Sequence, residues 1–445
     1  NGWLPCAEFA WGDTMLQFGR INNNWQSCYS MGYRVNVQLR EGERLTRNWF
    51  NKGLHVNMDG GQAPGSLTAK VGEGSLRHSP RWGDLAPGRV GNGTIEYDVP
   101  LAGGAFRAGA LAAVNLASKS EDQAGPAVHV KDPESPGVLD IRMPSSYVYL
   151  SGRLAFTPVL GAGGEIKVLV SDNNALDWKQ VAAVSAAGPQ SIDLKSLVLR
   201  RYAYVVRFVM KGKGTGLDSL TLTHDIQHSQ RPLPALARGE NKIRFSAGPP
   251  EGTITIEGAM EPSSKGKQLL LGDFHPKLDG YAADALPRGE GEKSITFPVK
   301  TPGDITRLRI SDHFLSSGKD SMYLIDVSFD AGKTWKTVDQ PDGLVGPRIF
   351  AGRYVTVGDV PPGTRSAQVR YRGIGRNTLV LTNARIDADY KEPAGGFRPV
   401  QVTYVWEEGG LEKKDVHVAR SAAETYTIAC ESTPVMKSLI VELAK

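Results

Sequence analysis

Two histidines four residues apart, His224 and His228, are the first residues whose spacing suggests chemistry. They match the spacing of the zinc motif His-Glu-x-x-His, in which a helix places two imidazoles on one face and the glutamate acts as a base. Here Asp225 replaces the glutamate, and residues 220–223 alternate between apolar and polar side chains as a strand does. We therefore expect solvated histidines at the end of a strand and no metal site. A zinc site is the alternative, since both histidines share a face of an extended chain.

A thiol nucleophile is the second candidate. Cys28 would need a helix behind it and an activating histidine, but the chain runs into a strand-like stretch at Tyr33, and nothing fixes the position of His55. Three cysteines cannot build a disulfide framework. We expect Cys28 to be buried or paired with Cys6, and the sequence leaves these two alternatives open.

Paired carboxylates are the third candidate, because glycoside hydrolysis uses two of them at a defined separation. Asp326 with Asp330 and Glu407 with Glu408 are examples, and the sequence does not give their separations. Solvated charge is the simpler interpretation. We predict no catalytic residue and no cofactor.

Sugar binding needs exposed aromatic rings that stack on a pyranose and polar groups that bond its hydroxyls. Residues of these types stand in loop-like or strand-edge positions. The candidate ligand contacts are Trp82, Tyr147, Tyr149, Asp312 and His313.

The stretch from Ser328 to Trp335 has the residue order of a tight β-hairpin. Asp330 can accept hydrogen bonds from the turn's N–H groups, Gly332 tolerates positive φ, and Trp335 can fold over the turn. A second stretch, Ser171 to Trp178, keeps the serine and tryptophan at the same spacing, 157 residues earlier. Strand-like stretches around both match in order, so we predict a duplicated unit the size of a β-sandwich.

The stretch from Ser328 to Trp335 resembles the Asp-box of bacterial sialidases and other secreted β-proteins. All five defining positions are present: Ser328, Asp330, Gly332, Thr334 and Trp335. Sialidases are six-bladed propellers with several Asp-boxes at blade spacing, which the 157-residue offset does not fit. Their Arg-Ile-Pro signature is also absent, because Phe350 follows Arg348-Ile349. We therefore interpret the Asp-box as a structural hairpin.

The duplicated region, residues 100–390, resembles the galactose-binding-like β-sandwich modules of large exported bacterial proteins, some of which carry sialidase-like or transglutaminase-like domains. We predict an all-β protein of tandem, jelly-roll-like sandwiches. The expected domains are a β-rich segment at 1–99 that includes a Gly- and Pro-rich loop, sandwiches at 100–236 and 237–390, and a C-terminal β-module at 391–445. Within the first segment, residues 34–39 and 44–49 are predicted to form a hairpin.

The composition of the chain limits the classes of partner that we expect it to bind. The 445 residues carry a net charge of +5 from 52 basic and 47 acidic side chains, with no basic run interleaved with aromatics, so no nucleic-acid partner is predicted. The sequence contains no run of eighteen consecutive apolar residues, so no membrane span is predicted. The chain lacks an initiator methionine, and we expect a processed product or a fragment.

These observations favour a non-catalytic, exported accessory region that binds carbohydrate or a cell-surface polymer, at an extracellular, cell-surface or periplasmic location. One alternative is a glycoside hydrolase of sialidase type. The other is a structural component of a cell-surface layer or filament, and homo-oligomerisation is left open.

Overall fold

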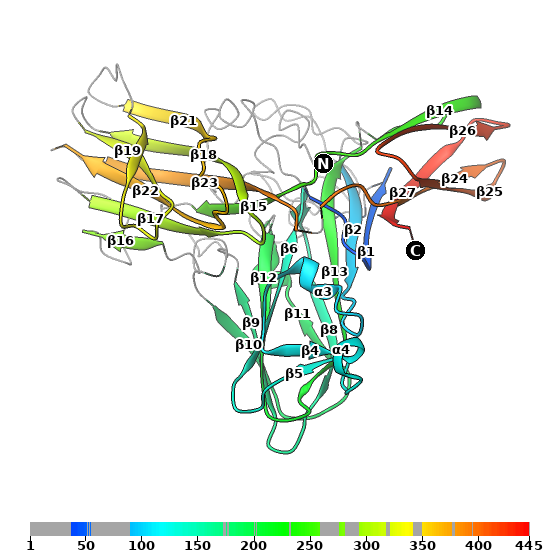
Figure 1. Ribbon diagram of the computed structural model, residues 1–445. Coiled ribbons are helices and arrows are strands. Elements are labelled where there is room, and N and C mark those ends of the chain that lie inside the picture. Colours follow the sequence, from blue (N-terminus) through cyan, green and yellow to red (C-terminus); the bar gives the residue numbers. More distant parts are fainter. Residues whose placement is uncertain are drawn as a thin grey trace.

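The computed structural model describes residues 37–50, 52, 54, 90–171, 175, 178–199, 201, 203–230, 233–258, 276–280, 293–316, 321–340, 349–375, 379–393 and 395–444. These residues form antiparallel sheets with three single-turn helices, α3 (Phe106–Gly109), α4 (Lys119–Asp122) and α5 (Lys195–Val198) (Figure 1). The predicted all-β fold of sandwiches is confirmed.

The first sandwich packs two sheets around one core. Buried and half-buried residues alternate along its strands, as in β9, where Ile166, Val168 and Val170 face inward. One sheet has the order β10 (Lys179–Val184), β9 (Glu165–Ser171), β12 (Ala203–Lys211), β6 (Gly137–Pro144) and β3 (Ala110–Val114). The other begins β11 (Gln190–Asp193), β8 (Arg153–Val159), β13 (Gly216–Ser229) and β2 (Val90–Asp98), with β4 (Leu116–Ser118), β5 (Val128–Val130) and β7 (Val148–Tyr149) alongside.

The second sandwich has its own core and the same strand order. Its sheets are β20 (Lys336–Asp339), β19 (Met322–Ser328), β22 (Ser366–Ile374), β17 (Lys293–Lys300) and β16 (Lys277–Asp279), and β21 (Ile349–Val357), β18 (Ile305–Ser316), β23 (Leu379–Lys391) and β15 (Glu251–Gly258). Taken in chain order, each of these strands holds the sheet position of its counterpart in the first sandwich. The hairpin β19–β20 therefore corresponds to β9–β10.

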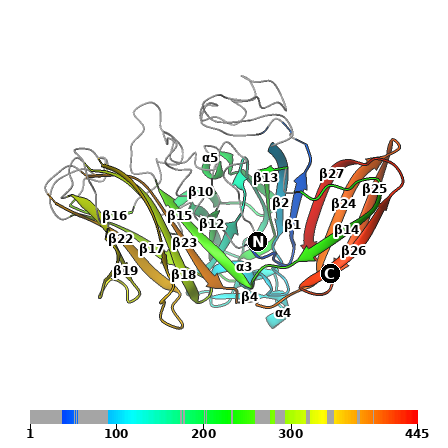
Figure 2. The same ribbon diagram turned by 90° about the horizontal axis from the view of Figure 1, so that it is seen from above.

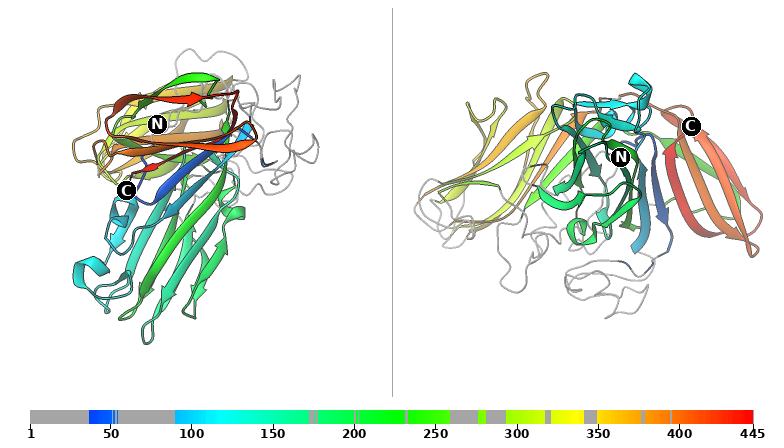
Figure 3. Two further views of the ribbon diagram at one scale, coloured as in Figure 1. Left: turned by 90° about the vertical axis from the view of Figure 1, so that its right-hand side faces the viewer. Right: turned by 90° about the horizontal axis from the view of Figure 1, so that it is seen from below.

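Strand β1 (Glu43–Asn48) joins the first sandwich to the C-terminal unit. It pairs with β2 on one side and with β27 (Val435–Leu443) on the other, and the sheet continues through β24 (Val400–Glu408) to β25 (Leu411–Ala419). Figure 3 shows the blue strands β1 and β2 between the first sandwich and the red strands of the C-terminal unit. A side chain at position 93 would meet the Thr46 carbonyl at 2.0 Å, so glycine permits this pairing.

A two-stranded sheet of β14 (Gly239–Ser246) and β26 (Ala423–Cys430) completes the C-terminal unit. A third core lies in this unit, with Tyr404, Trp406 and Leu439 among its buried residues. Seen from above, this unit and the second sandwich lie on opposite sides of the first sandwich (Figure 2).

The predicted hairpin between residues 34–39 and 44–49 is not formed by the described residues. Positions 37–40 are irregular, and β1 pairs with β2 and β27 instead. Gln38 donates to the carbonyls of Pro249 and Glu251, at 2.7 and 2.9 Å, so this segment is tied to the chain at the start of β15.

The predicted domain boundaries stay a prediction. Strand β2, in the segment 1–99, pairs along β13 of the first sandwich. Strand β14, in the segment 237–390, pairs along β26 of the C-terminal unit.

The turn from Ser328 to Trp335 is held by the bonds that its residue types predict. Asp330 accepts from the backbone N–H and the hydroxyl of Thr334, at 2.9 and 2.6 Å. The Gly332 N–H donates to Ser328 Oγ at 2.9 Å, and Trp335 Nε1 donates to the Gly332 carbonyl at 3.0 Å. Gly332 has a φ of 86°, and its amide and carbonyl both serve the turn.

The earlier stretch shares two of these features. The Ala175 N–H donates to Ser171 Oγ at 3.0 Å, as that of Gly332 does to Ser328. Arg207 of β12 lies 3.8 Å from the centre of a Trp178 ring, and Arg370 of β22 lies 3.9 Å from that of Trp335. In both sandwiches, an arginine of a neighbouring strand therefore packs on the hairpin tryptophan.

Replacing Asp330 with alanine should destabilise the second sandwich in a pH-dependent way. Hydrogen bonds from the Thr334 hydroxyl and N–H, and from Ser328, lower the pKa of Asp330 to about 2. A lowered folded-state pKa contributes stability at neutral pH, and this contribution is lost as the pH falls from about 4 to about 2. Urea unfolding of the full chain should show a gap between wild type and variant at pH 7 that narrows over this range.

The matched control is Asp279→Ala, at an exposed aspartate of β16 in the same sandwich. It should leave the unfolding midpoint nearly unchanged. An Asp330→Ala protein that kept its stability but lost a sugar-cleaving activity would contradict a structural role for this hairpin.

Candidate functional site

The two histidines considered as zinc ligands lie on the same buried face of β13, separated by Ile226. His224 is 1% and His228 0% exposed, which corrects the expectation of solvated side chains. The reason is that β13 is a long central strand between β2 and β8, so its core-facing positions are covered. The Tyr204 hydroxyl contacts His224 Nε2, and the Asn48 N–H donates to His228 Nε2 at 3.2 Å.

Burial lowers the pKa of His224 to about 4, so this imidazole is neutral at physiological pH. Its Nδ1 faces the Ile95 carbonyl at 3.4 Å, an acceptor, which places the N–H on Nδ1 and leaves Nε2 to accept from the Tyr204 hydroxyl. No group of three possible metal ligands occurs among the described residues.

The predicted sugar contacts fall in different places. Tyr147 is half-buried and lines a cavity, whereas Tyr149 is 0% exposed and has no surface to offer a sugar ring. Asp312 is also buried and forms an ion pair with Arg353. Trp82 lies outside the described residues, as does the side chain of His313, whose backbone belongs to β18.

The catalytic candidates are not assembled into a site by the described residues. Cys6, Cys28 and His55 lie outside the described part of the chain. Asp326 is buried beneath Arg370 and Arg372, with closest contacts of 2.8 Å, while Asp330 serves the turn. Glu407 pairs with Lys437, and Glu408 accepts from Trp406 Nε1 at 3.0 Å.

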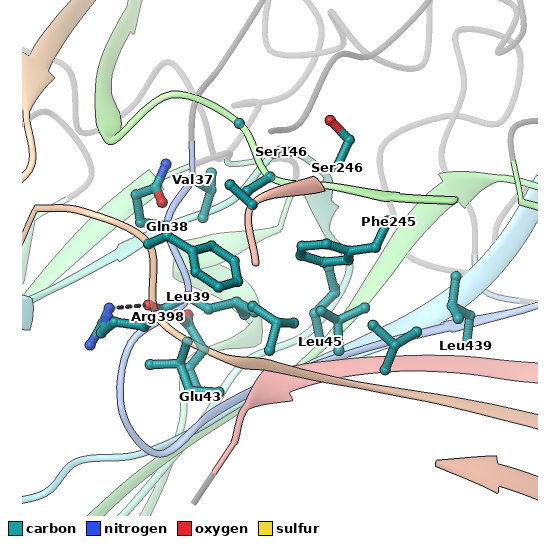
Figure 4. A pocket seen from close by; sticks show the side chains of 18 of the residues that line it. Val37, Gln38, Leu39, Glu43, Leu45, Ser146, Phe245, Ser246, Arg398 and Leu439 are labelled. Atoms are coloured by element: carbon teal, nitrogen blue, oxygen red, sulfur yellow. Dashed lines mark hydrogen bonds between the residues drawn. The ribbon is translucent and has the colours of Figure 1, made fainter. Parts of the chain in front are cut away.

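A cavity of about 570 Å³ opens where the three units meet (Figure 4). Its volume is within the range of small-molecule sites. Four stretches far apart in the sequence line it, together with Ile95: positions 37–47, 144–147, 234–250 and 392–443. Figure 4 shows Gln38, Leu39 and Arg398 across the cavity from Phe245 and Leu439.

Ion pairs and hydrogen bonds fix these walls. Arg40 bonds Glu43 at 2.8 Å and donates to the Arg142 carbonyl at 2.6 Å. Arg142 in turn pairs with Glu392 at 3.1 Å, just beyond β23 of the second sandwich. Burial opposes the charge of Arg40, but the attraction of the nearby Glu43 carboxylate outweighs burial and raises the pKa of Arg40, so this guanidinium stays charged.

Aromatic rings supply much of the cavity's apolar surface. Ile243 and Phe245 alternate with exposed residues of β14, which turns their side chains inward. Phe245 and Phe397 meet edge to face with centroids 6.2 Å apart. Tyr147, Tyr404 and Tyr426 also line the cavity. Rings of this kind suit the apolar face of a sugar.

Two polar atoms of the lining residues are buried without a hydrogen-bond partner in the described part of the chain. They are Nε of Arg47 and the hydroxyl of Tyr426. Another nitrogen of Arg47 donates to the Tyr147 hydroxyl at 3.1 Å. Unpaired buried donors carry a free-energy cost that a bound acceptor can relieve.

Of the cavity residues, the sequence singled out only Tyr147. Arg47 and Phe245 carry no motif, and their importance comes from the meeting of chain segments hundreds of residues apart. The alternation of polar and apolar residues from Lys242 to Ser246 was the one local signal in the sequence for Phe245.

No family model matches this chain, and no curated protein matches its sequence. Among solved structures, dimeric latent PorU from Porphyromonas gingivalis is similar at 8% identity and a TM-score of 0.21, covering 69% of this chain and 32% of that one. The N-terminal CBM22-1-CBM22-2 tandem domain of Paenibacillus barcinonensis Xyn10C has 8% identity and a TM-score of 0.20, covering 61% and 89%.

A putative secreted protein from Parabacteroides distasonis has 8% identity and a TM-score of 0.17, covering 77% of this chain and 99% of that one. The chain spans about a third of PorU and of an Arthrobacter globiformis isomalto-dextranase. At these TM-scores the similarities carry no argument about function. Within the described ranges, no helix has the length and apolar character needed to cross a membrane.

Replacing Tyr204 with phenylalanine should destabilise the first sandwich by about 1–3 kcal/mol, because it leaves a buried imidazole nitrogen of His224 without its donor. Urea unfolding of the full chain measures the change. The double variant Tyr204→Phe/His224→Leu is the control, since removing both polar partners should recover part of the loss. Equal stability of wild type and Tyr204→Phe would contradict the assignment of this bond.

Proposed function

We propose that this chain is a non-catalytic β-sandwich region of an exported protein, and that it binds carbohydrate in the cavity where its three units meet. The cavity carries the proposal. It combines aromatic rings with polar groups, and its volume suits a short oligosaccharide. The walls are fixed by the Arg40–Glu43 and Arg142–Glu392 pairs, so the site needs little ordering when a ligand enters.

The arrangement of the units supports an accessory role. The two sandwiches share one strand order and a hairpin with the same serine hydrogen bond and the same packing of arginine on tryptophan. This fits a duplicated structural module of the size predicted from the offset of 157 residues. We infer that the C-terminal unit and the segments that flank the second sandwich, at Pro250 and Glu392, serve to complete the cavity beside the first sandwich.

The state of the cavity's carboxylates favours binding over hydrolysis. Glu43 and Glu392 are the acidic residues among those that line it, and each is held by an arginine, Arg40 or Arg142. Glycoside hydrolysis needs one carboxyl group that can donate a proton to the leaving oxygen and a second one at a defined distance. Here each carboxylate is instead engaged in a salt bridge with an arginine.

Filling the cavity should abolish sugar binding without removing any core contact. Ala247 is half-buried, lines the cavity and follows the alternation of Ile243 and Phe245, so Ala247→Trp places an indole on their face of the chain. We expect the full chain to bind members of a glycan array and Ala247→Trp to lose at least about tenfold in affinity. Ser196→Trp, at an exposed serine of α5 away from the cavity, is the matched control and should bind as wild type does.

The same glycans are then incubated with the protein and analysed by chromatography. Released products that depend on Glu43 or Glu392 would overturn the non-catalytic assignment. Absence of binding to any glycan, together with concentration-dependent ordered polymers, would favour a structural component of a cell-surface layer instead.

A further inference from the structure

We propose that the cavity selects sugars that carry carboxylates, that is, oligosaccharides containing uronic acids. This inference rests on the proposed function and adds the chemical class of its ligand. It follows from the charges around the cavity, which do not balance.

The charged residues that line the cavity are Glu43, Arg47, Arg244, Glu392 and Arg398. Both glutamates are neutralised by arginines outside the lining, Arg40 and Arg142. The three lining arginines form no ion pair with the described residues. Arg47 instead bonds a neutral acceptor, the Tyr147 hydroxyl, at 3.1 Å. Arg398 bonds another, the Leu39 carbonyl, at 2.7 Å (Figure 4). The cavity therefore keeps uncompensated positive charge.

Arg47 is the arginine best placed to recognise a carboxylate inside the cavity. It shares the inward face of β1 with Glu43 and Leu45, because side chains two residues apart point the same way. Its Nε is buried and lacks a hydrogen-bond partner among the described residues, while its bond to Tyr147 holds one edge of the guanidinium. A carboxylate that engaged the other edge would gain charge-assisted, paired hydrogen bonds, the geometry that arginine favours.

Arg398 provides a second cationic point at a distance from the first. It is tied to Leu39, which precedes the turn closed by the hydrogen bond from the Glu43 N–H to the Arg40 carbonyl. Arg47 lies on the other side of this turn, four residues along β1 from Glu43, a length of strand of roughly 13 Å. Two separated guanidinium groups suit a chain with repeated carboxylates better than a single acidic sugar. Arg244, exposed on the neighbouring β14, adds positive charge at the edge of the cavity.

The test compares uronic-acid oligosaccharides with their methyl esters, which keep the sugar framework and lose the charge. A panel of uronate trisaccharides, their methyl esters and neutral hexose trisaccharides is titrated into the full chain by calorimetry. We expect at least one uronate to bind roughly tenfold or more tightly than its ester, with an affinity that falls as salt rises. Arg47→Gln and Arg398→Gln should each reduce that preference severalfold.

Arg365→Gln is the matched control. This exposed arginine of the second sandwich pairs with Asp304 away from the cavity, and its loss changes the net charge equally. It should leave the preference intact. An equal effect of Arg365→Gln and Arg47→Gln would show that the preference reflects overall charge, and it would overturn the inference. A folded Arg47→Gln protein with an unchanged preference for uronates would also overturn it.

The panel also separates this inference from the proposed function. Equal binding of acids and esters, or binding of neutral sugars alone, would reject the selectivity while sugar binding stands. Binding of none of the three classes would reject both. Circular dichroism confirms that each variant is folded, and the two cavity arginines lie on different segments, so one folding failure leaves the other variant to decide.

Discussion

The two-sided pairing of β1 is the constraint on which the rest of the structure depends. Its backbone bonds β2 of the first sandwich and β27 of the C-terminal unit at the same residues, Arg44 to Arg47. A strand paired on both edges cannot slip in register without turning every side chain to the other face. The register of β1 therefore fixes both the position of the C-terminal unit and the inward direction of Glu43, Leu45 and Arg47.

Burial of charge at the meeting point of the three units follows from this geometry. Arg40, Glu43 and Arg142 have at most 7% of their surface exposed, and Arg40 also lies 3.7 Å from the ring centre of Tyr97. Buried ion pairs add little net stability when compared with apolar packing, but breaking one leaves an uncompensated charge at high cost. We interpret these linked ion pairs as interactions that specify one arrangement of the units. The walls of the adjacent cavity are therefore held in one geometry.

The two sandwiches show how one strand order tolerates different local chemistry. The hairpin of the second sandwich uses a full set of side-chain bonds around Asp330, whereas the corresponding stretch of the first keeps the serine bond at Ala175 and the packing of arginine on tryptophan. The serine bond is local, because it connects residues within one turn, whereas the packing of arginine on tryptophan joins neighbouring strands. The burial of Tyr149 and His224 was not predictable from the sequence, since it depends on which strand becomes central in the sheet.

From the sequence alone, the all-β class and the hydrogen bonds of Asp330 in the Ser328–Trp335 turn were predictable. Both depend on strand alternation and turn chemistry over a few residues. Tertiary structure alone decided the pairing of β1, the association of β14 with β26, and the cavity. Arg47, Phe245 and Arg398 stand far apart along the chain, and only long-range strand pairing and side-chain packing bring them around one space.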